Sequence, residues 1–185
     1  MHILLTRPIN DVKELIIKFK SLGHDVSHLP VIKISKKKFN VVNYSDYSGI
    51  IFTSANAVEF LDTKHINKNI HCFCVGSATE NKALKKGFQN VYAAEGNVEN
   101  LKEIIIRNFN KKIGKLLYVS GETISLNLHK QLTNEDYTVE RIINYTVDHV
   151  DEIDQNFIEK LKITMPDIIY VYSQNSAKSL LNIIK

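Results

Sequence analysis

The chain has 185 residues, of which 44% are hydrophobic and 24% charged, with 24 basic residues against 20 acidic ones. This is the composition of an ordinary folded protein with one large or two small domains, and it excludes a disordered or fibrous chain. The net charge of +4 is spread along the sequence, so it gives no reason to expect nucleic acid as a partner and fits an anionic small molecule equally well.

The sequence has no sign of a membrane segment, a metal site or a disulfide. No apolar run approaches the ~20 residues that a membrane-spanning helix needs, and Arg7-Pro8 interrupts the N-terminal run too early for a signal peptide. Cys72 and Cys74 are separated by one residue, which suits neither a disulfide nor a metal centre. We therefore expect buried thiols in a cytoplasmic protein with no membrane partner.

The apolar pattern predicts strands and helices that alternate along the chain. A strand at residues 2–5 precedes an amphipathic helix at residues 12–22, which Gly23 ends in a left-handed conformation. Residues 36–38, three lysines, are expected to form a solvated connector. Strands and helices of these lengths indicate an α/β fold with parallel sheets. Further strands are predicted at residues 26–29, 49–52, 70–75, 91–92, 115–119, 139–147 and 168–172.

One strand-to-helix junction occurs twice. The first follows the strand at residues 49–52 and carries Ser54 and Asn56, and the second carries Ser173 and Asn175 at matching positions. A strand that leads directly into a helix leaves the first N–H groups of that helix unpaired, where Ser or Thr can cap them and an anion can bind. The repetition indicates an internal duplication.

Short motifs at the strand ends follow one another in a characteristic order. They are Leu4-Leu5-Thr6-Arg7-Pro8, Leu29-Pro30, Ile51-Phe52-Thr53-Ser54-Ala55-Asn56-Ala57-Val58, Val75-Gly76-Ser77-Ala78-Thr79, Val119-Ser120-Gly121-Glu122, Tyr145 and Tyr172-Ser173. In their order and spacing, over nearly the whole chain, these motifs resemble the uroporphyrinogen-III synthase family.

The resemblance implies two small parallel-sheet α/β domains of flavodoxin-like or Rossmann-like type, joined by a two-stranded linker, with the active-site cleft between them. One domain would comprise residues 1–33 and 149–185, and the other residues 36–146. Family members continue with another strand, a turn and further helices, whereas this sequence stops at Ile183-Ile184-Lys185. We therefore expect the first domain to be shortened at its C-terminus and to expose a sheet edge or an apolar face.

The family cyclises hydroxymethylbilane, a polycarboxylate, to uroporphyrinogen III with loss of water and inversion of the terminal pyrrole ring. The resemblance thus implies a monomeric hydro-lyase of porphyrin and haem biosynthesis that needs no cofactor and no metal. The alternative is a non-catalytic two-lobed α/β module that binds a small polyanion or a tetrapyrrole, as a truncated or inactive homologue would. A flavodoxin-like signalling domain ranks last, because the strand ends carry Thr, Ser and Gly instead of an acidic phosphoacceptor pocket.

Tyr145 is the candidate catalytic residue, because it matches the family tyrosine whose phenol assists departure of the hydroxyl as water. Structural roles compete with this assignment and with the binding assignments, notably a core tyrosine for Tyr145, N-capping for Ser54 and a surface position for Arg7. Glu122 would repel the substrate, and we expect it to cap a helix. The candidate substrate-binding residues are Thr6, Arg7, Ser54, Ala55, Asn56, Gly76, Ser77, Thr79, Ser120, Gly121, Ser173 and Asn175.

Overall fold

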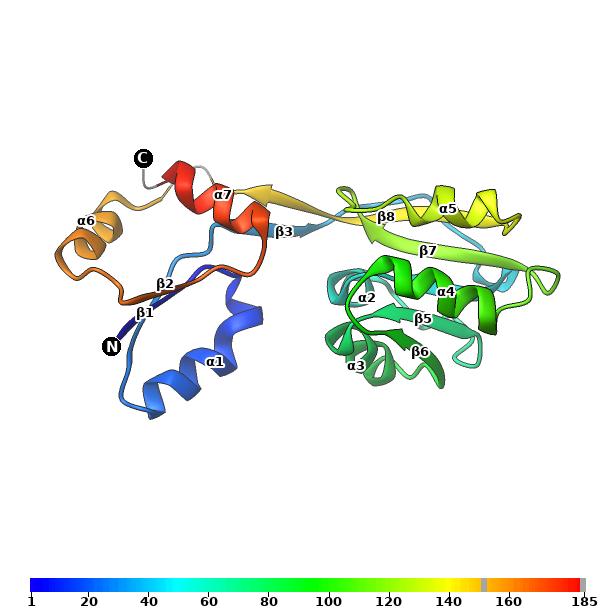
Figure 1. Cartoon of the computed structure of the whole chain (residues 1–185), viewed down its shortest axis with the longest axis horizontal. Helices are drawn as coiled ribbons and strands as arrows, with labels where there is room; N and C mark the ends of the chain where they lie inside the picture. The colour runs from blue at the N-terminus through cyan, green and yellow to red at the C-terminus, as the bar shows by residue number, and fades with distance from the viewer. Residues whose placement is uncertain (151–152, 184–185) are drawn as a thin grey trace. The chain divides into compact units, whose positions relative to one another are not determined.

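The computed structural model describes residues 1–150 and 153–183, apart from the side chain of Asn175. The chain divides into two compact units: unit 1 consists of Met1–Ser35 with Val147–Lys185, and unit 2 consists of Lys36–Thr146. Figure 1 shows the helices and strands of both units. Parallel strands and helices alternate in each unit, which confirms the predicted α/β fold class.

The larger sheet has six strands in the order β3-β8-β7-β4-β5-β6. The pairs β8-β7, β7-β4, β4-β5 and β5-β6 are parallel. β3 and β8 contribute residues to both units and lie side by side in Figure 1. The predicted connector at residues 36–38 is wrong for Lys36, which ends β3, because pairing with β8 gives this extended backbone its hydrogen bonds. The strands are β3 (Ile32–Lys36), β4 (Tyr47–Phe52), β5 (His71–Val75), β6 (Asn90–Ala94), β7 (Lys115–Gly121) and β8 (Val139–His149).

Helices cover both faces of this sheet. Leu101 of α4 and Leu132 of α5 pack with Ile51 and Phe73 in one apolar core. The alternate strand residues point to the opposite face, and α2 and α3 contact each other. The sheet is therefore buried on both sides, as is usual for parallel strands. These helices are α2 (Ala55–Phe60), α3 (Ser77–Lys85), α4 (Val98–Asn108) and α5 (Leu128–Asn134), and a 3-10 turn, η1 (Tyr44–Asp46), precedes β4.

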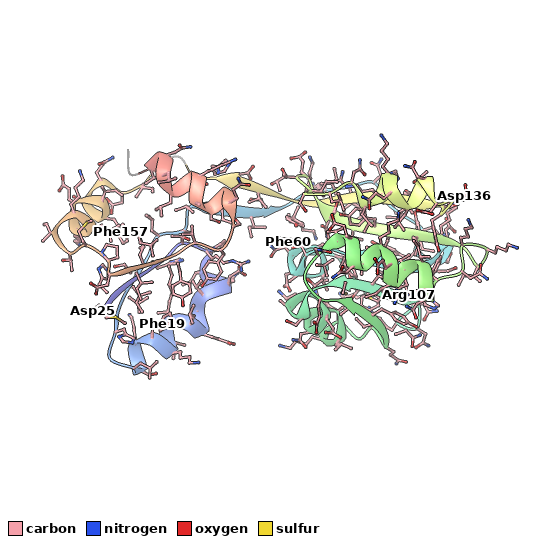
Figure 2. All side chains as sticks on the ribbon, viewed as in Figure 1. Phe19, Asp25, Phe60, Arg107, Asp136 and Phe157 are labelled. Atoms are coloured by element: carbon pink, nitrogen blue, oxygen red, sulfur yellow. The ribbon has the colours of Figure 1, made fainter. Side chains whose placement is uncertain are left out.

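Unit 1 contains a three-stranded parallel sheet in the order β2-β1-β9. Val12 and Phe19 of α1 pack against Leu5 on one face, whereas Leu4 packs with Phe157 of α6 on the other. Figure 2 labels Phe19 and Phe157, one from each core. The elements are β1 (His2–Leu5), α1 (Ile9–Ser21), β2 (Asp25–His28), α6 (Gln155–Ile163), β9 (Ile168–Tyr170) and α7 (Gln174–Ile183).

β9 is an edge strand of the smaller sheet, and its residues are exposed. Ile168, Ile169 and Tyr170 retain 38%, 42% and 41% of their surface, which is unusual for apolar residues on a strand edge that other chains can pair with. Among the described strands, β9 therefore presents an open edge with apolar side chains. Ile184 and Lys185, where the sequence stops, lie outside the described residues.

The two cysteines are buried and free, as expected. Their Sγ atoms lie 3.9 Å apart on the same side of β5. The hydrogen bond with Cys74 and burial raise the pKa of the Cys72 thiol, so this thiol stays protonated and unreactive in the folded protein.

We expect Asn97→Ala to lower the free energy of unfolding by about 1 kcal/mol. The Asn97 side chain accepts a hydrogen bond of 2.9 Å from the Asn100 N–H at the first turn of α4, and alanine leaves that N–H without its partner. Urea unfolding followed by circular dichroism measures the change. Asn97→Ser is the matched control, because serine is also a good N-cap. Equal losses for the two variants would contradict the capping role.

The stability of the protein should fall at alkaline pH, in part because of Tyr47. Its hydroxyl donates a hydrogen bond of 2.5 Å to the Glu140 carboxylate, and burial together with this carboxylate raises the pKa of Tyr47. The folded protein therefore holds the Tyr47 proton more tightly than the unfolded chain, whose tyrosines titrate near pH ~10. The contribution to stability is complete below that pH and is lost as the pH rises above it.

Urea unfolding between about pH 8 and about pH 11 tests this expectation. Wild-type stability should fall more steeply than that of Tyr47→Phe, which has no phenol to ionise. Equal slopes for the two proteins would show that Tyr47 makes no such contribution.

Candidate active site

The strand order of the larger sheet reverses between β4 and β7. The chain leaves β4 toward β5 and β6, returns to β7 on the other side of β4, and continues outward to β8. In an open parallel sheet, a reversal of this kind leaves a crevice at the carboxyl ends of the two diverging strands, and ligands bind there. The ends of β4 and β7 are therefore the expected place for a site in unit 2.

A pocket of about 130 Å³ occupies this position, and we call it the Tyr145 pocket. The residues that follow β4 and β7 form most of its wall, together with the start of α4 and one residue of β8. Side-chain hydroxyl groups line it, and none of the described acidic residues does, so it suits an anionic or hydrogen-bonding ligand. Its lining residues are Thr53, Ser54, Val98, Tyr118, Gly121, Thr123, Ile124, Ser125, Leu126 and Tyr145.

The Tyr145 ring lies directly against Gly121. A Cβ on Gly121 would stand 2.6 Å from Cζ of Tyr145 and 2.9 Å from its hydroxyl oxygen, so only glycine leaves room for the ring. On α2, Phe60 has its ring centroid 6.3 Å from that of Tyr145, and Figure 2 labels Phe60. Gly121, a predicted substrate-binding residue, thus makes the space in which the catalytic candidate is held.

Tyr118 brings a second phenol into the Tyr145 pocket. Its side chain is 1% exposed, and its hydroxyl lies 3.2 Å from Oγ1 of Thr53. Burial raises the pKa of Tyr118 above its ordinary value, so its hydroxyl keeps its proton and stays able to donate a hydrogen bond.

Arg141 of β8 places a positive charge beside this wall. Its guanidinium donates to Oγ of Ser120 over 2.8 Å and to the Gly121 carbonyl over 2.7 Å, and it lies 6.0 Å from the centre of the Tyr118 ring. Within the described residues, Arg141 takes part in no salt bridge. An uncompensated positive charge beside the pocket favours an anionic ligand.

The strand predicted at residues 115–119 ends too early, and the capping role expected for Glu122 is wrong. Ser120 and Gly121 are the last residues of β7, and Ser120 is completely buried against Arg141, because the pairing of β7 with β8 continues beyond the apolar run. Glu122 caps no helix. It pairs with Lys37, and α5 is capped by Asn127.

Ser54 caps α2, which is one of the two roles weighed for it. Its Oγ accepts a hydrogen bond of 3.2 Å from the Asn56 N–H, and it also lines the Tyr145 pocket. Ala55 and Asn56 form the first turn of α2 and are partly exposed.

The motif at residues 76–79 lies at the end of β5, outside the lining of the Tyr145 pocket. Gly76 has φ 76°, a conformation that favours glycine, and its N–H donates to the Ala94 carbonyl over 2.9 Å. Thr79 is buried, whereas Ser77 is exposed at the start of α3. Of these candidates, Ser77 is the one whose side chain is accessible.

The corresponding strand ends of unit 1 carry the remaining candidates. Thr6 is completely buried, and its hydroxyl donates to the Tyr170 carbonyl over 2.6 Å. Arg7 forms an ion pair of 3.1 Å with Asp11 and lies 5.0 Å from the centre of the Tyr172 ring. Thr6 therefore joins the ends of β1 and β9, while Arg7 is partly exposed beside them.

Ser173 is the counterpart of Ser54 in unit 1. Its Oγ accepts a hydrogen bond of 3.1 Å from the Ser176 N–H at the start of α7, so both copies of the duplicated junction use serine as an N-cap. Asn175 lies in α7, and its side chain is outside the described residues.

A family model described as uroporphyrinogen-III synthase HemD matches residues 13–185. The chain belongs to the uroporphyrinogen-III synthase family. This family consists of enzymes of haem biosynthesis that act on a small tetrapyrrole substrate, so the match supports the enzyme and gives no support to the alternative of a non-catalytic binding module. Comparison with curated proteins finds no match.

Two solved structures of uroporphyrinogen-III synthases are similar to this chain. The enzyme from Helicobacter pylori is 15% identical with a TM-score of 0.63, over 100% of this chain and 78% of that one. A variant of the enzyme from Thermus thermophilus is 14% identical with a TM-score of 0.58, over 98% of this chain and 76% of that one. At these identities the likeness shows the shared fold.

In this member of the uroporphyrinogen-III synthase family, the Tyr145 pocket also contains residues that were not among the predicted site residues. Thr53, Tyr118 and Ser125 add hydroxyl groups to its wall, and Arg141 adds charge behind it. Tyr118 lies inside an apolar strand and resembles a core residue. The one feature of the sequence that could have indicated its place in the pocket is its position, three residues before Gly121 at the end of the strand.

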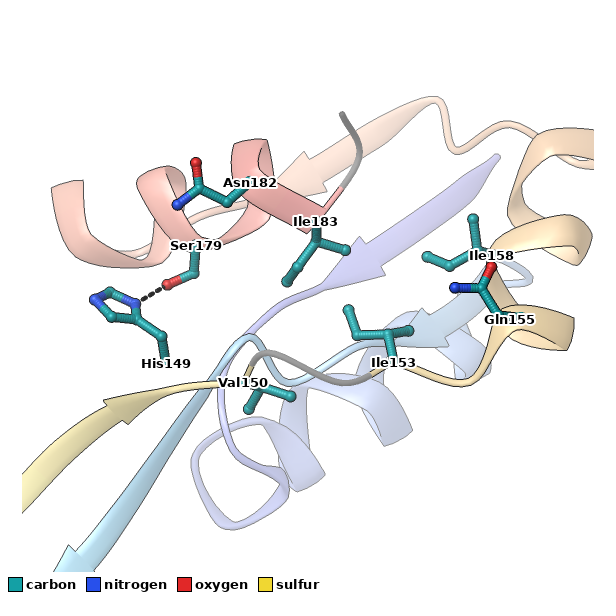
Figure 3. A pocket seen from close by; sticks show the side chains of 8 residues that line it. All are labelled: His149, Val150, Ile153, Gln155, Ile158, Ser179, Asn182 and Ile183. Carbon is teal, nitrogen blue, oxygen red and sulfur yellow. Dashed lines mark hydrogen bonds between the residues drawn. The ribbon is translucent and has the colours of Figure 1, made fainter.

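A second cavity lies within unit 1 and is shown in Figure 3. Its volume is about 210 Å³, and His149 and Ser179 point toward each other across it and share a hydrogen bond. None of the predicted site residues lines this cavity, whereas Ser54, Gly121 and Tyr145 all line the Tyr145 pocket. The Tyr145 pocket is therefore the candidate active site.

In residues 1–150 and 153–183, no group of three or more His, Cys, Asp or Glu is placed to hold a metal ion. None of the described helices combines the length and the apolar character needed to cross a membrane.

Proposed function

We propose that this chain is a hydro-lyase that cyclises hydroxymethylbilane to uroporphyrinogen III, with loss of water and inversion of the terminal pyrrole ring. The observation that carries the proposal is the position of Tyr145, the family's candidate acid, in a hydroxyl-lined pocket at the reversal of the strand order. In this proposal the protein is a cytoplasmic monomer that uses no cofactor or metal and binds no nucleic acid. The two free buried thiols support that compartment.

Tyr145 acts on the departing hydroxyl group. The C–O bond of the hydroxymethyl group breaks as the phenol gives its proton to that oxygen, which leaves as water, and the pyrrole nitrogen supplies electrons to the carbon left behind. This carbon then forms a bond to the substituted α-carbon of the terminal pyrrole, at the other end of the chain. The bond from that α-carbon to its original methylene bridge breaks, and the methylene carbon forms a new bond to the free α-carbon of the same pyrrole, which inverts the ring. The proton released from that pyrrole returns to Tyr145, so the net change is the loss of one water molecule.

Most of the rate acceleration comes from holding a flexible substrate in its ring-closing conformation. We assign carboxylate binding to the accessible candidates at the strand ends, which are Arg7, Ser54, Asn56 and Ser77. Arg7 can exchange Asp11 for a substrate carboxylate, because this ion pair is partly exposed and such pairs are weak. Thr6, Thr79 and Ser120 are buried and take the role of supporting the backbone around these residues.

A coupled assay tests the function. Hydroxymethylbilane is generated in place, and the uroporphyrin isomers are separated after oxidation. Because spontaneous closure gives isomer I, we expect isomer III in proportion to the amount of protein. Isomer I alone, from protein that circular dichroism shows to be folded, would overturn the proposal.

A further inference from the structure

The pairing of β7 with β8 changes register immediately before Tyr145. Ser120 lies opposite Ile143, but the next residue, Gly121, lies opposite Tyr145. Asn144 is therefore an extra residue on β8, which makes this a β-bulge. In a regular register Asn144 would face Gly121, and Tyr145 would lie one position further along. The bulge is what places the Tyr145 ring against the one residue that has room for it.

Asn144 is buried and makes two hydrogen bonds to other parts of the chain. Its side chain is 0% exposed, and its Nδ2 donates to the Ala57 carbonyl of α2 over 2.8 Å. Its own carbonyl accepts from the Lys37 N–H over 2.8 Å. Ala57 supplies one of the last four carbonyls of a six-residue helix, which have no partner further along that helix. The amide of Asn144 therefore joins the bulge to the helix that Ser54 begins.

The oxygen of the same side-chain amide makes no hydrogen bond within the described part of the chain. Among the described residues, Oδ1 of Asn144 is a buried acceptor without a hydrogen-bond partner, and an apolar side chain would avoid the cost of burying it. Packing alone would therefore favour an apolar side chain at position 144. The hydrogen bond that fixes the bulge explains why an amide is present there.

We propose that Asn144 is a positioning residue that fixes the β-bulge and thereby aims the Tyr145 phenol into its pocket. The link to catalysis rests on the proposed function. The placement of the ring does not rest on it. Without the amide, the regular register competes with the bulge, and a shift of one residue would carry Tyr145 away from Gly121.

The test uses the full chain and the variant Asn144→Ala, with Ile142→Val as matched control. Ile142 is a buried residue of the same strand, two positions earlier and outside the bulge, so its substitution loosens packing without releasing Asn144. A 3-fluorotyrosine at position 145 reports the ring environment by ¹⁹F NMR. If the alanine variant does not fold, Asn144→Val removes the same hydrogen bond while filling more of the space.

We expect the ¹⁹F resonance to move or broaden in the Asn144 variant and to stay in place in Ile142→Val. We expect kcat to fall about 10-fold with KM unchanged, because the reacting groups are misplaced without loss of binding. In a Tyr145→Phe background the same substitution should have almost no further effect on kcat, since its effect runs through the phenol.

An unchanged ¹⁹F resonance in the folded variant would overturn the proposal. So would a full kcat effect that persists in the Tyr145→Phe background, which indicates a general structural role. If the wild type forms no isomer III, the proposed function fails by itself, and the ¹⁹F comparison alone decides whether Asn144 positions the ring.

Discussion

Replacing Gly121 by alanine is expected to lower the rate of uroporphyrinogen III formation about 10²-fold and to destabilise the protein by about 1–3 kcal/mol. The new Cβ would stand 2.6 to 2.9 Å from atoms of the Tyr145 phenol, closer than carbon and oxygen atoms can approach without bonding. The ring must move, because Gly121 lies in β7 and its backbone is held by pairing with β8. Initial rates and urea unfolding measure the two effects.

Gly23→Ala is the control, because Gly23 is required by its backbone conformation and not by a close neighbouring side chain. Gly23 has φ 79°, and no atom lies within 4 Å of the position that a Cβ would take, so alanine there is strained through its backbone alone and costs about 1 kcal/mol. It should reduce stability without changing the rate. A Gly121→Ala variant that keeps the wild-type rate would contradict the tight packing of Tyr145 on Gly121.

Tyr145→Phe is expected to lower kcat about 10²-fold while KM stays nearly the same. The loss is placed at the lower end of the range for general acids, because a hydroxyl on a pyrrolic carbinol leaves readily. The ring remains, so the contacts with Gly121 and Phe60 are kept and the fold should not change. Single-turnover measurements with preformed hydroxymethylbilane separate the chemical step from binding.

Tyr137→Phe is the matched control for the loss of a tyrosine hydroxyl. Tyr137 is buried in the apolar core of unit 2, where its hydroxyl donates to the Phe109 carbonyl over 3.3 Å. Its removal should affect stability but not kcat. If Tyr145→Phe also keeps its kcat, the phenol has no role as an acid, and the activity would have to come from substrate positioning alone.

The local features of the fold could be predicted because they depend on neighbouring residues. Ser54 caps a helix where the sequence indicated a helix start, and Gly23 adopts the left-handed conformation expected at a helix end. Each depends on a few consecutive residues, whose backbone requirements the residue types reveal.

Features that depend on pairing between distant strands could not be predicted in this way. The apolar run that ends at Val119 gave no indication that β7 continues through Ser120, because the continuation depends on β8 and Arg141. The bulge at Asn144 has the same origin, and it decides where Tyr145 points. Alternation along a single strand assigns faces, but it does not reveal a change of register with the neighbouring strand.

The parallel pairing of β1 with β9 has a consequence for the order in which the protein is made. Ile3 pairs with Ile168, whereas unit 2 is complete once Thr146 has been added. At a synthesis rate of ~5–20 residues per second, the first strand waits on the order of 10 seconds for its partner. Unit 2 can fold on the ribosome during this interval, while β1 and β2 leave one flank of their sheet open to chaperones.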